Sequence, residues 1–293
     1  MIIDSLQSLS PCHSRAIIIN YNTKLVSTLA ILSTLRHGGM PLVVIDCEST
    51  DGSYDHFKEL SARHDFDLFS MPLREHGKTL DLIFSSIPSD IVLAIDSDLE
   101  ILEPSLIEFF FRYIDHPTVY GCGFRNGPGY LTGDAFRGSS LEGALFDERF
   151  WMPFVMLKVA PVREALMRGV SFAARTVDNE YSLLRIPSRL RRLSILRRLL
   201  KSGPQWLRHP YHTTLRPSTV FHDTGSLMDH HLKHQQGLYF LGLPEPVHGQ
   251  HVHHYFGATR NVFDPSDQNG CGGTNAIAEH VRGRLRSEYS LQM

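Results

Sequence analysis

Asp96 and Asp98 are two carboxylates one residue apart, directly after a run of apolar residues. In an extended chain, residues i and i+2 point to the same side, so both carboxylates can face one ligand. Oxygen ligands of this kind suit a hard divalent cation, Mg²⁺ or Mn²⁺, which can bridge the oxygens of a diphosphate. The pair therefore predicts a cation site at Asp96 and Asp98. The alternative interpretation is an acidic turn exposed to solvent.

Polar residues also follow the two preceding apolar runs of the chain. Asn20 and Asn22 follow the first run, and Asp46 ends the second. Ligands of parallel α/β sheets bind outside the carboxyl ends of the strands, so these residues are expected beside the acidic pair. There Asp46 could accept hydrogen bonds from a ribose hydroxyl or a base amide, whereas Asp51, which precedes a glycine, indicates a turn.

Strands and helices are expected to alternate over the first 120 residues, after which the pattern is less regular. The strands are short β-branched apolar runs, and the helices carry apolar residues at helical spacing. We expect strands at residues 16–20, 42–46, 66–70, 91–95 and 150–158, and helices at residues 24–37, 54–64, 75–87, 161–169 and 177–185. This order predicts an α/β fold with a mostly parallel sheet flanked by helices.

The 293 residues are expected to form a single domain. We expect a loose leader over residues 1–14, the domain over residues 15–265 and a C-terminal tail over residues 266–293. Within the domain, residues 15–120 form the more regular half and residues 121–265 the less regular half.

The composition is that of an ordinary globular protein, with 42% hydrophobic and 20% charged residues. A formal net charge of −2 excludes a generally basic nucleic-acid binder. The four cysteines form no CxxC pair, so neither a zinc knuckle nor a disulfide framework is indicated. No apolar stretch approaches the roughly 18 residues of a membrane-spanning helix. We therefore expect a cytoplasmic protein.

One local exception to the balanced charge is the basic segment, residues 185–216, which includes SRLRRLSILRRLLK. Leu and Ile fall between pairs of Arg, which predicts an amphipathic helix with a cationic face. Such a face suits an anionic acceptor, an anionic phospholipid surface at the inner side of the cell membrane or nucleic acid, of which nucleic acid is the least expected. The alternative is a charged helix exposed only to solvent.

The sequences AIIINYN, VVIDCESTDGS, HGKTLD and IVLAIDSDLEI occur in an order that resembles the family-2-type glycosyltransferases of the GT-A (Rossmann-like) fold. The resemblance covers residues 15–102 most specifically and residues 150–185 less so. It departs from the family pattern at Cys47 and Glu48, where Asp or Asn and then Gly or Asn are usual. It implies that residues 15–120 are the nucleotide-sugar half and residues 121–265 the acceptor half.

The resemblance implies an enzyme that moves a sugar from a nucleotide-diphosphate donor to a hydroxyl of a saccharide, glycolipid or other acceptor, with inversion, in glycan or glycolipid biosynthesis. Asp46 would contact the base or ribose, Asp96 the ribose or a metal-bound water, and Asp98 the Mn²⁺ or Mg²⁺ ion. The implied nucleotide-sugar-binding residues are Asn20, Asn22, Asp46, Lys78, Asp96, Ser97 and Trp151.

The resemblance also implies a general base at the start of a late helix and a late histidine on the metal. Asp178 is the first candidate for the base and Glu180 the second, since both open the segment VDNEYSLLR. Asp178 as a simple helix N-cap is the alternative. His222, in VFHDTGS, is the first candidate for the metal ligand and His254, in VHGQHVHHYFG, the second. An ordinary surface or core histidine is the alternative for each.

Other functions are compatible with parts of the pattern. A retaining glycosyltransferase would share the acidic pair. A nucleotidyltransferase would share the parallel sheet and the carboxylate-bound metal, but it should carry a Gly-rich basic loop where this chain has YNTKLVS. A metal-dependent hydrolase could use the late histidines, and a non-catalytic module could bind a nucleotide sugar or, through the basic segment, nucleic acid.

Overall fold

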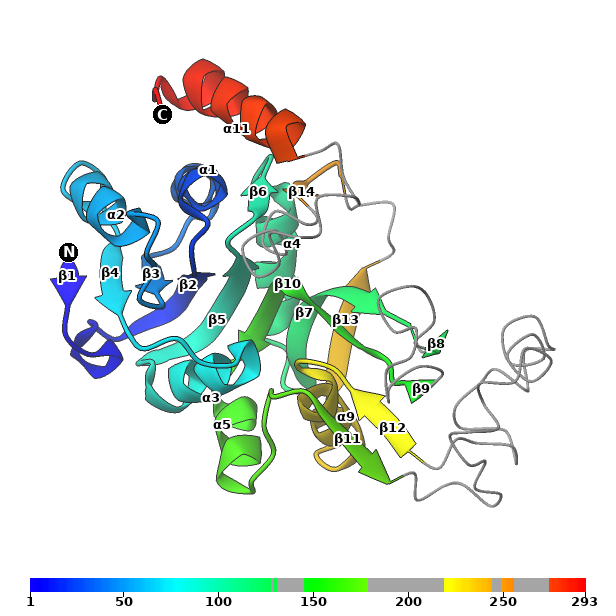
Figure 1. Cartoon of the computed structure of the whole chain (residues 1–293). Coiled ribbons are helices and arrows are strands. Elements are labelled where there is room, and N and C mark those ends of the chain that lie inside the picture. Colours follow the sequence, from blue (N-terminus) through cyan, green and yellow to red (C-terminus); the bar gives the residue numbers. More distant parts are fainter. Residues whose placement is uncertain (128, 131–144, 179–218, 244–248, 256–273) are drawn as a thin grey trace.

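The structure of the protein is a computed structural model that describes residues 1–127, 129–130, 145–178, 219–243, 249–255 and 274–293 (Figure 1). Its centre is an eight-stranded sheet in the order β1-β4-β3-β2-β5-β10-β7-β13. These strands are β1 (Ile2–Ile3), β2 (Cys12–Asn20), β3 (Leu42–Asp46), β4 (Asp67–Ser70), β5 (Ser89–Asp96), β7 (Val119–Asn126), β10 (Arg149–Lys158) and β13 (Tyr239–Leu243).

The sheet is parallel on one side and mixed on the other. Strands β1, β4, β3, β2 and β5 pair in parallel, so their carboxyl ends lie at one edge. Strand β10 runs antiparallel to both β5 and β7, and β13 pairs in parallel with β7. The expectation of an α/β fold with a mostly parallel sheet is confirmed.

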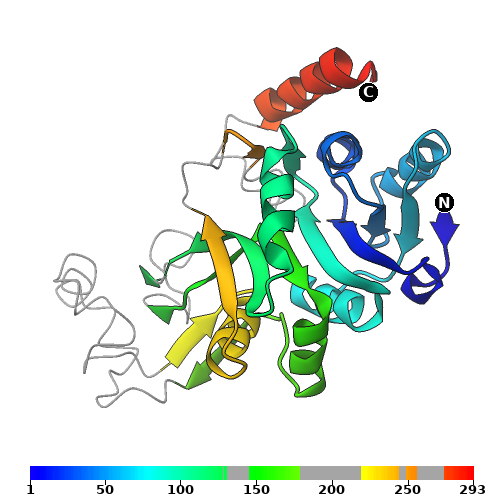
Figure 2. The same ribbon diagram turned by 180° about the vertical axis from the view of Figure 1, so that it is seen from behind.

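Helices cover both faces of the sheet (Figures 1 and 2). One apolar core lies under α1 (Lys24–His37), α2 (Ser53–Ser61), α4 (Ser105–Ile114) and α11 (Thr274–Tyr289). The other lies under α3 (His76–Ser86), α5 (Val159–Met167), α9 (Ser226–His234) and the short 3-10 helix η1 (Leu6–Ser8). Neighbouring strand residues alternate between the cores: Ile18 belongs to the first and Ile17 to the second, as the period of a strand requires.

Two small sheets extend the central one. Strands β11 (Arg175–Asp178), β12 (Thr219–His222), β9 (Leu145–Phe146) and β8 (Gly129–Tyr130) form a four-stranded sheet. Strand β6 (Leu99–Ile101), which follows β5 after a short turn, pairs antiparallel with β14 (Val252–His254). This second pairing brings the late histidine segment to the end of β5.

The structure corrects two expectations about the ends of the domain. Residues 1–14 are not a loose leader, because β1 pairs with β4, Leu6 and Leu9 are buried, and β2 begins at Cys12. The C-terminal tail contains α11, whose Val281 and Leu285 are fully buried in the first core. Both ends therefore contribute to the packing of the domain.

The segment 177–185 does not begin as a helix. Val177 and Asp178 belong to strand β11, which pairs antiparallel with β12. The remainder of that segment and the basic segment 185–216 lie outside the described residues. Among the described helices, none has both the length and the apolar character that crossing a membrane requires.

Candidate metal centre

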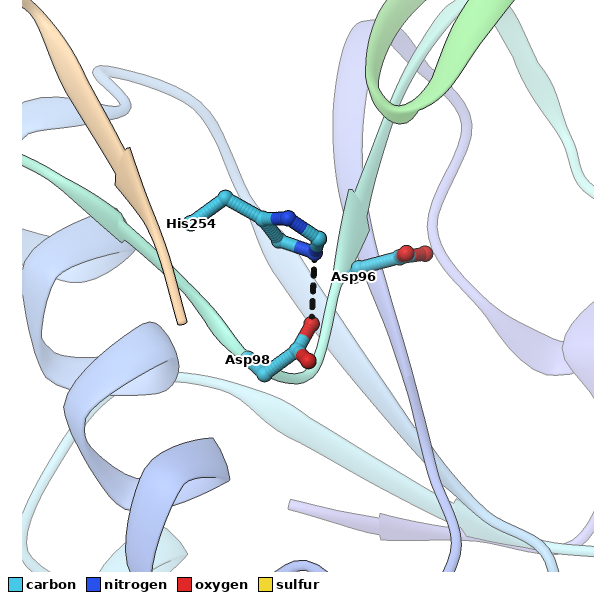
Figure 3. A group of neighbouring side chains, drawn as sticks. All are labelled: Asp96, Asp98 and His254. Carbon is cyan, nitrogen blue, oxygen red and sulfur yellow. Dashed lines mark ion pairs between the residues drawn. The ribbon is translucent and has the colours of Figure 1, made fainter. Parts of the chain in front are cut away.

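Asp96, Asp98 and His254 lie together where β5 ends; Figure 3 shows Asp98 and His254 pointing toward each other and the Asp96 carboxylate pointing away from the imidazole. Asp96 is the last residue of β5, Asp98 lies in the turn before β6, and His254 ends β14. One possible ligand atom from each residue lies within 4.8 Å of the other two. The Nε2 atom of His254 is 3.0 Å from Oδ1 of Asp98, whose side chain is only 2% exposed.

The pairing of β6 with β14 holds His254 in this place. His254 lies opposite Leu99 in the antiparallel register, and the backbone N–H of Tyr255 donates to the carbonyl oxygen of Asp98 at 2.8 Å. The ring of Trp151, in the neighbouring strand β10, lies edge-on to the imidazole with ring centroids 5.2 Å apart. Trp151 is buried, so it packs against a candidate ligand and leaves little surface for stacking on a sugar.

The donor set fits a divalent cation. Two carboxylates and one imidazole provide oxygen and nitrogen ligands, which suit Mn²⁺ and, less well, Mg²⁺. Burial raises the pKa of Asp96. The charge of His76 lowers this pKa, and the charge of the neighbouring Asp98 raises it. A cation bound between the carboxylates would favour the ionised form of Asp96, because an opposite charge nearby stabilises a carboxylate.

A cavity of about 220 Å³ opens beside the acidic pair. It is lined by Asp96 and Ser97 from the end of β5, by Tyr21 from the end of β2, and by Arg74, His76 and Thr79 around the start of α3. Arg74 and His76 bring positive or protonatable groups to a cavity next to a cation site, an arrangement that suits an anionic ligand. Neither was a candidate from the sequence, although His76 is the first residue of the HGKTLD segment and Arg74 lies two residues before it.

Lys78, the residue that sequence analysis chose from that segment, is not among those that line this cavity. Its side chain is 54% exposed, and its Nζ atom lies 3.5 Å from Asp81 and 3.2 Å from Ser171. The helix turns Lys78 away from His76 because residues two apart in a helix do not share a face.

Asn20 and Asp46 lie at the expected edge of the sheet, but both are fully buried. Oδ1 of Asp46 accepts from Asn20 Nδ2 at 2.7 Å and from the Ser49 hydroxyl at 2.6 Å, and Oδ2 accepts from the Ser49 backbone N–H at 3.0 Å. The Asn20 amide oxygen in turn accepts from the hydroxyls of Thr23 and Ser27. These two side chains therefore hold the loops after β2 and β3 together.

Asn22 and Ser97 continue this network. Asn22 has a φ of 53°, and its side-chain oxygen accepts from the Thr50 backbone N–H at 2.6 Å. Ser97, which is buried between the two aspartates, accepts from the Thr23 hydroxyl at 3.1 Å. The loops after β2, β3 and β5 are thus joined by side-chain hydrogen bonds beneath the acidic pair.

His222 lies elsewhere, at the end of β12, which Figures 1 and 2 both show well apart from β6 and β14. It is buried, and its Nδ1 is 2.9 Å from the Ser226 hydroxyl and 3.8 Å from Asp147. Burial lowers the pKa of His222 to about 4. Among the described residues, His254 and not His222 joins the acidic pair.

Of the two candidate bases, only Asp178 lies among the described residues. Asp178 is the last residue of β11, opposite Thr219 of β12, and Glu180 lies outside the described residues. A third carboxylate, Asp223, lies just before α9, and its Oδ2 accepts from Arg149 Nη2 at 2.8 Å. The signal for Asp223 was its place ahead of a helix in the second half of the chain.

No family model matches the chain, and no curated protein matches it. Three solved structures show what it is similar to. A mannosyltransferase from Pyrobaculum calidifontis, PcManGT in complex with GDP-Man and Mn²⁺, has 18% identity over 57% of this chain and 48% of its own, with a TM-score of 0.40. S. aureus TarS 1–349 has 15% identity over 52% and 49%, with a TM-score of 0.37.

The third structure is a 4-diphosphocytidyl-2C-methyl-D-erythritol synthase from Anaerococcus prevotii, with 9% identity over 54% of this chain and 74% of its own and a TM-score of 0.39. The alignment with PcManGT spans less than half of that protein, at 48%. With TM-scores between 0.37 and 0.40, these likenesses assign the chain to no family and give it no activity.

Proposed function

We propose that this chain is a glycosyltransferase of the GT-A type that uses a nucleotide-diphosphate sugar and a divalent cation. The observation that carries the proposal is the convergence of Asp96, Asp98 and His254 beside a cavity that also contains Arg74 and His76. A cation site and cationic side chains next to each other suit a diphosphate. The sequence resemblance over residues 15–102 supports a nucleotide sugar as its source.

In this proposal Asp98 and His254 are the direct metal ligands, and Asp96 is a ligand or holds a ribose hydroxyl. When bound there, Mn²⁺ or Mg²⁺ supplies positive charge that stabilises the departing nucleoside diphosphate. Arg74 and His76 bind the phosphate oxygens from the other side of the cavity. Asn20 and Asp46 act indirectly, because their hydrogen bonds fix the loops that carry Tyr21 and Cys47 to the cavity wall.

An inverting transfer needs a base to take the proton of the acceptor hydroxyl. We propose Asp223 as a third candidate for this role, in addition to Asp178 and Glu180. Asp223 has two supports: it precedes α9, and its Oδ2 accepts from Arg149 Nη2 at 2.8 Å, which holds the carboxylate in place. Replacing the true base should lower the turnover number by about 10²- to 10⁴-fold and leave donor affinity nearly intact. Asp223→Asn, Asp178→Asn and Glu180→Gln compared in one assay identify which residue acts.

The proposal is tested by offering UDP-, GDP- and dTDP-sugars to the purified full chain, with Mn²⁺, Mg²⁺ or EDTA. Donor binding is followed by calorimetry, and release of nucleoside diphosphate by a coupled assay. We expect binding of at least one donor that Mn²⁺ strengthens and that Asp98→Ala abolishes. Asp90→Ala is the matched control, since Asp90 is an exposed carboxylate near the opposite end of the same strand β5.

Failure of every donor to bind with Mn²⁺ present would contradict the proposal. Transfer of a nucleotidyl group instead of a sugar would support the nucleotidyltransferase alternative. The anomeric configuration of a sugar product, determined by NMR, separates inversion from retention.

A further inference from the structure

The metal centre has a buried acidic neighbour that it does not use. Glu100 lies in β6, two residues after Asp98, and its side chain is 1% exposed. A buried carboxylate is costly unless it is paired and hydrogen-bonded. Its partners come from two segments near the C-terminal end of the chain, the residue after β14 and helix α11.

The first partner is Tyr255, the residue after His254. Its hydroxyl donates to Glu100 Oε2 at 2.8 Å. Burial and the carboxylate both raise the pKa of Tyr255, so the hydroxyl keeps its proton and acts as a donor. The backbone N–H of Tyr255 donates to the carbonyl of Asp98. Tyr255 therefore connects the chain at His254 to Glu100 through its side chain and to Asp98 through its backbone.

The second partner is Arg284 on α11. Its Nε and Nη2 atoms donate to Glu100 Oε1 at 2.9 and 2.6 Å. The same guanidinium reaches Glu288 through Nη1 at 3.2 Å, and Glu288 also accepts from Arg36 of α1 at 3.3 Å. Since Val281 and Leu285 fix α11 in the core, Arg284 holds Glu100 from a well-anchored helix.

We infer that Arg284 is a positioning residue for the metal centre: through Glu100 and Tyr255 it holds β6 and β14 in the register that places Asp98 and His254 together. The inference rests on the proposed metal site. Residues that orient metal ligands from behind typically change metal affinity by about 10- to 100-fold when they are replaced.

Simple electrostatics predicts the opposite effect, which makes the inference testable. Arg284→Gln leaves the Glu100 carboxylate without its cationic partner. The net charge near the site becomes more negative, which would attract a cation. Positioning instead predicts weaker binding, because β6 and β14 lose the contact that fixes their ligands. The direction of the change in Mn²⁺ affinity therefore separates the two effects.

The experiment measures binding of Mn²⁺ alone to the full chain by electron paramagnetic resonance of the free ion. Nitrogen modulation of the bound Mn²⁺ signal reports coordination by imidazole. For Arg284→Gln we expect Mn²⁺ affinity lower by about 10- to 100-fold and a weaker nitrogen modulation. Arg284→Lys keeps the charge, loses the paired hydrogen bonds and should show a smaller loss in the same direction; it decides the matter if the Gln variant does not fold.

Arg36→Gln is the matched control, because it removes the ion pair of α1 with Glu288 of α11 and leaves Glu100 untouched. We expect its Mn²⁺ affinity to equal that of the wild type. If folded Arg284 variants bind Mn²⁺ as tightly as the wild type or more tightly, with full nitrogen modulation, the positioning role of Arg284 is contradicted, and the proposed metal site is not. A wild-type chain that binds no Mn²⁺, or binds it equally well after His254→Ala, would overturn the proposed metal site as well.

Discussion

The polar side chains at this site differ in their partners: some face the proposed ligand, and others form hydrogen bonds within the protein. Asp98 and His254 point toward each other, and Asp96 faces the neighbouring cavity. Asp46, which ends a strand in the same way, uses both carboxylate oxygens to accept hydrogen bonds from Asn20 and Ser49. A carboxylate at the end of a buried strand can therefore be a ligand or a support for its own loop, and its hydrogen-bond partners decide which.

The burial of His222 makes the free energy of unfolding depend on pH. Burial lowers its pKa from 6.5 to about 4 in the folded chain. As the pH falls below 6.5, the unfolded chain binds a proton that the folded chain does not, so the free energy of unfolding decreases until about pH 4. The total effect is about 3 kcal/mol, and about 2 kcal/mol of it should be lost by pH 5.

Urea unfolding of the wild type and of His222→Gln at pH 7.5 and pH 5.0 measures this contribution. The loss of stability on acidification should be about 2 kcal/mol smaller in the variant. Equal pH dependence in the wild type and His222→Gln would show that His222 is not held neutral by the fold.

Among the helices and strands, the loop after β3 supports two helices at once. Asp51 accepts from the Lys24 backbone N–H at the start of α1, at 3.0 Å, and from the Ser53 backbone N–H at the start of α2, also at 3.0 Å. These amides have no partner within their own helices, so one carboxylate satisfies a free donor of each. The loop thereby fixes α1 relative to α2 below the proposed donor site.

Asp51→Ala should lower the free energy of unfolding by about 1–2 kcal/mol, because both helices lose a capping hydrogen bond. Urea unfolding monitored by circular dichroism measures the change. Asp55→Ala is the matched control, an exposed carboxylate in the first turn of α2, and should cost only a few tenths of that amount. Equal effects of the two substitutions would indicate that Asp51 acts through its charge alone.

Gly77 allows α3 to approach the chain at Phe172 and Ala173. A Cβ atom at Gly77 would lie 2.4 Å from the Ala173 Cα atom and 2.6 Å from the Phe172 carbonyl carbon, both backbone atoms. Gly77→Ala must therefore move the start of α3, where His76 lines the cavity, and should cost about 1–3 kcal/mol.

Gly283→Ala provides the opposite case, because a Cβ atom in that part of α11 would meet nothing within 4 Å. It should stabilise the chain by about 0.5–1 kcal/mol through better helix propensity. Thermal unfolding of both variants measures the difference. A Gly77→Ala variant as stable as the wild type would show that α3 and the Phe172 segment separate without cost.

The helices and strands between residues 15 and 98 could be predicted because their signals are local. Helix α1 and strand β3 have the expected bounds, since each is set by its own apolar pattern and by the polar residues that follow. The pairing of β6 with β14 has no such signal: it joins two three-residue strands far apart in the sequence. His254 was therefore a second choice until the fold brought it to Asp98.

The orientation of side chains at strand ends was also beyond the sequence. All five residues of β3 are buried, so the pattern contains no alternation to show which way Asp46 points. Arg74 was missed because it lies in the loop before α3, outside the motifs, and His76 because Lys78 was chosen from the same HGKTLD segment. What could be predicted was the edge of the sheet at which the polar residues gather, since parallel strands share that edge.

Over the full chain, the metal centre joins the beginning and the end of the domain. Its candidate ligands are at positions 96, 98 and 254, and the helix that contacts Glu100 behind them is α11. The site therefore exists only when the central sheet, β14 and α11 are all in place. A cation that binds only the folded chain stabilises it in proportion to the logarithm of its concentration, so unfolding of the entire domain should report metal binding.

Mn²⁺ at about 100 times its dissociation constant should add about 2.7 kcal/mol to the free energy of unfolding, seen as a higher Tm in calorimetry. The gain with Mg²⁺ at the same concentration should be smaller, since imidazole is a better ligand for Mn²⁺. His254→Gln should remove most of this preference, because the remaining ligands are oxygens. An equal rise in Tm with both ions in the wild type would contradict a role for His254, and a rise that survives Asp98→Asn would place the cation elsewhere.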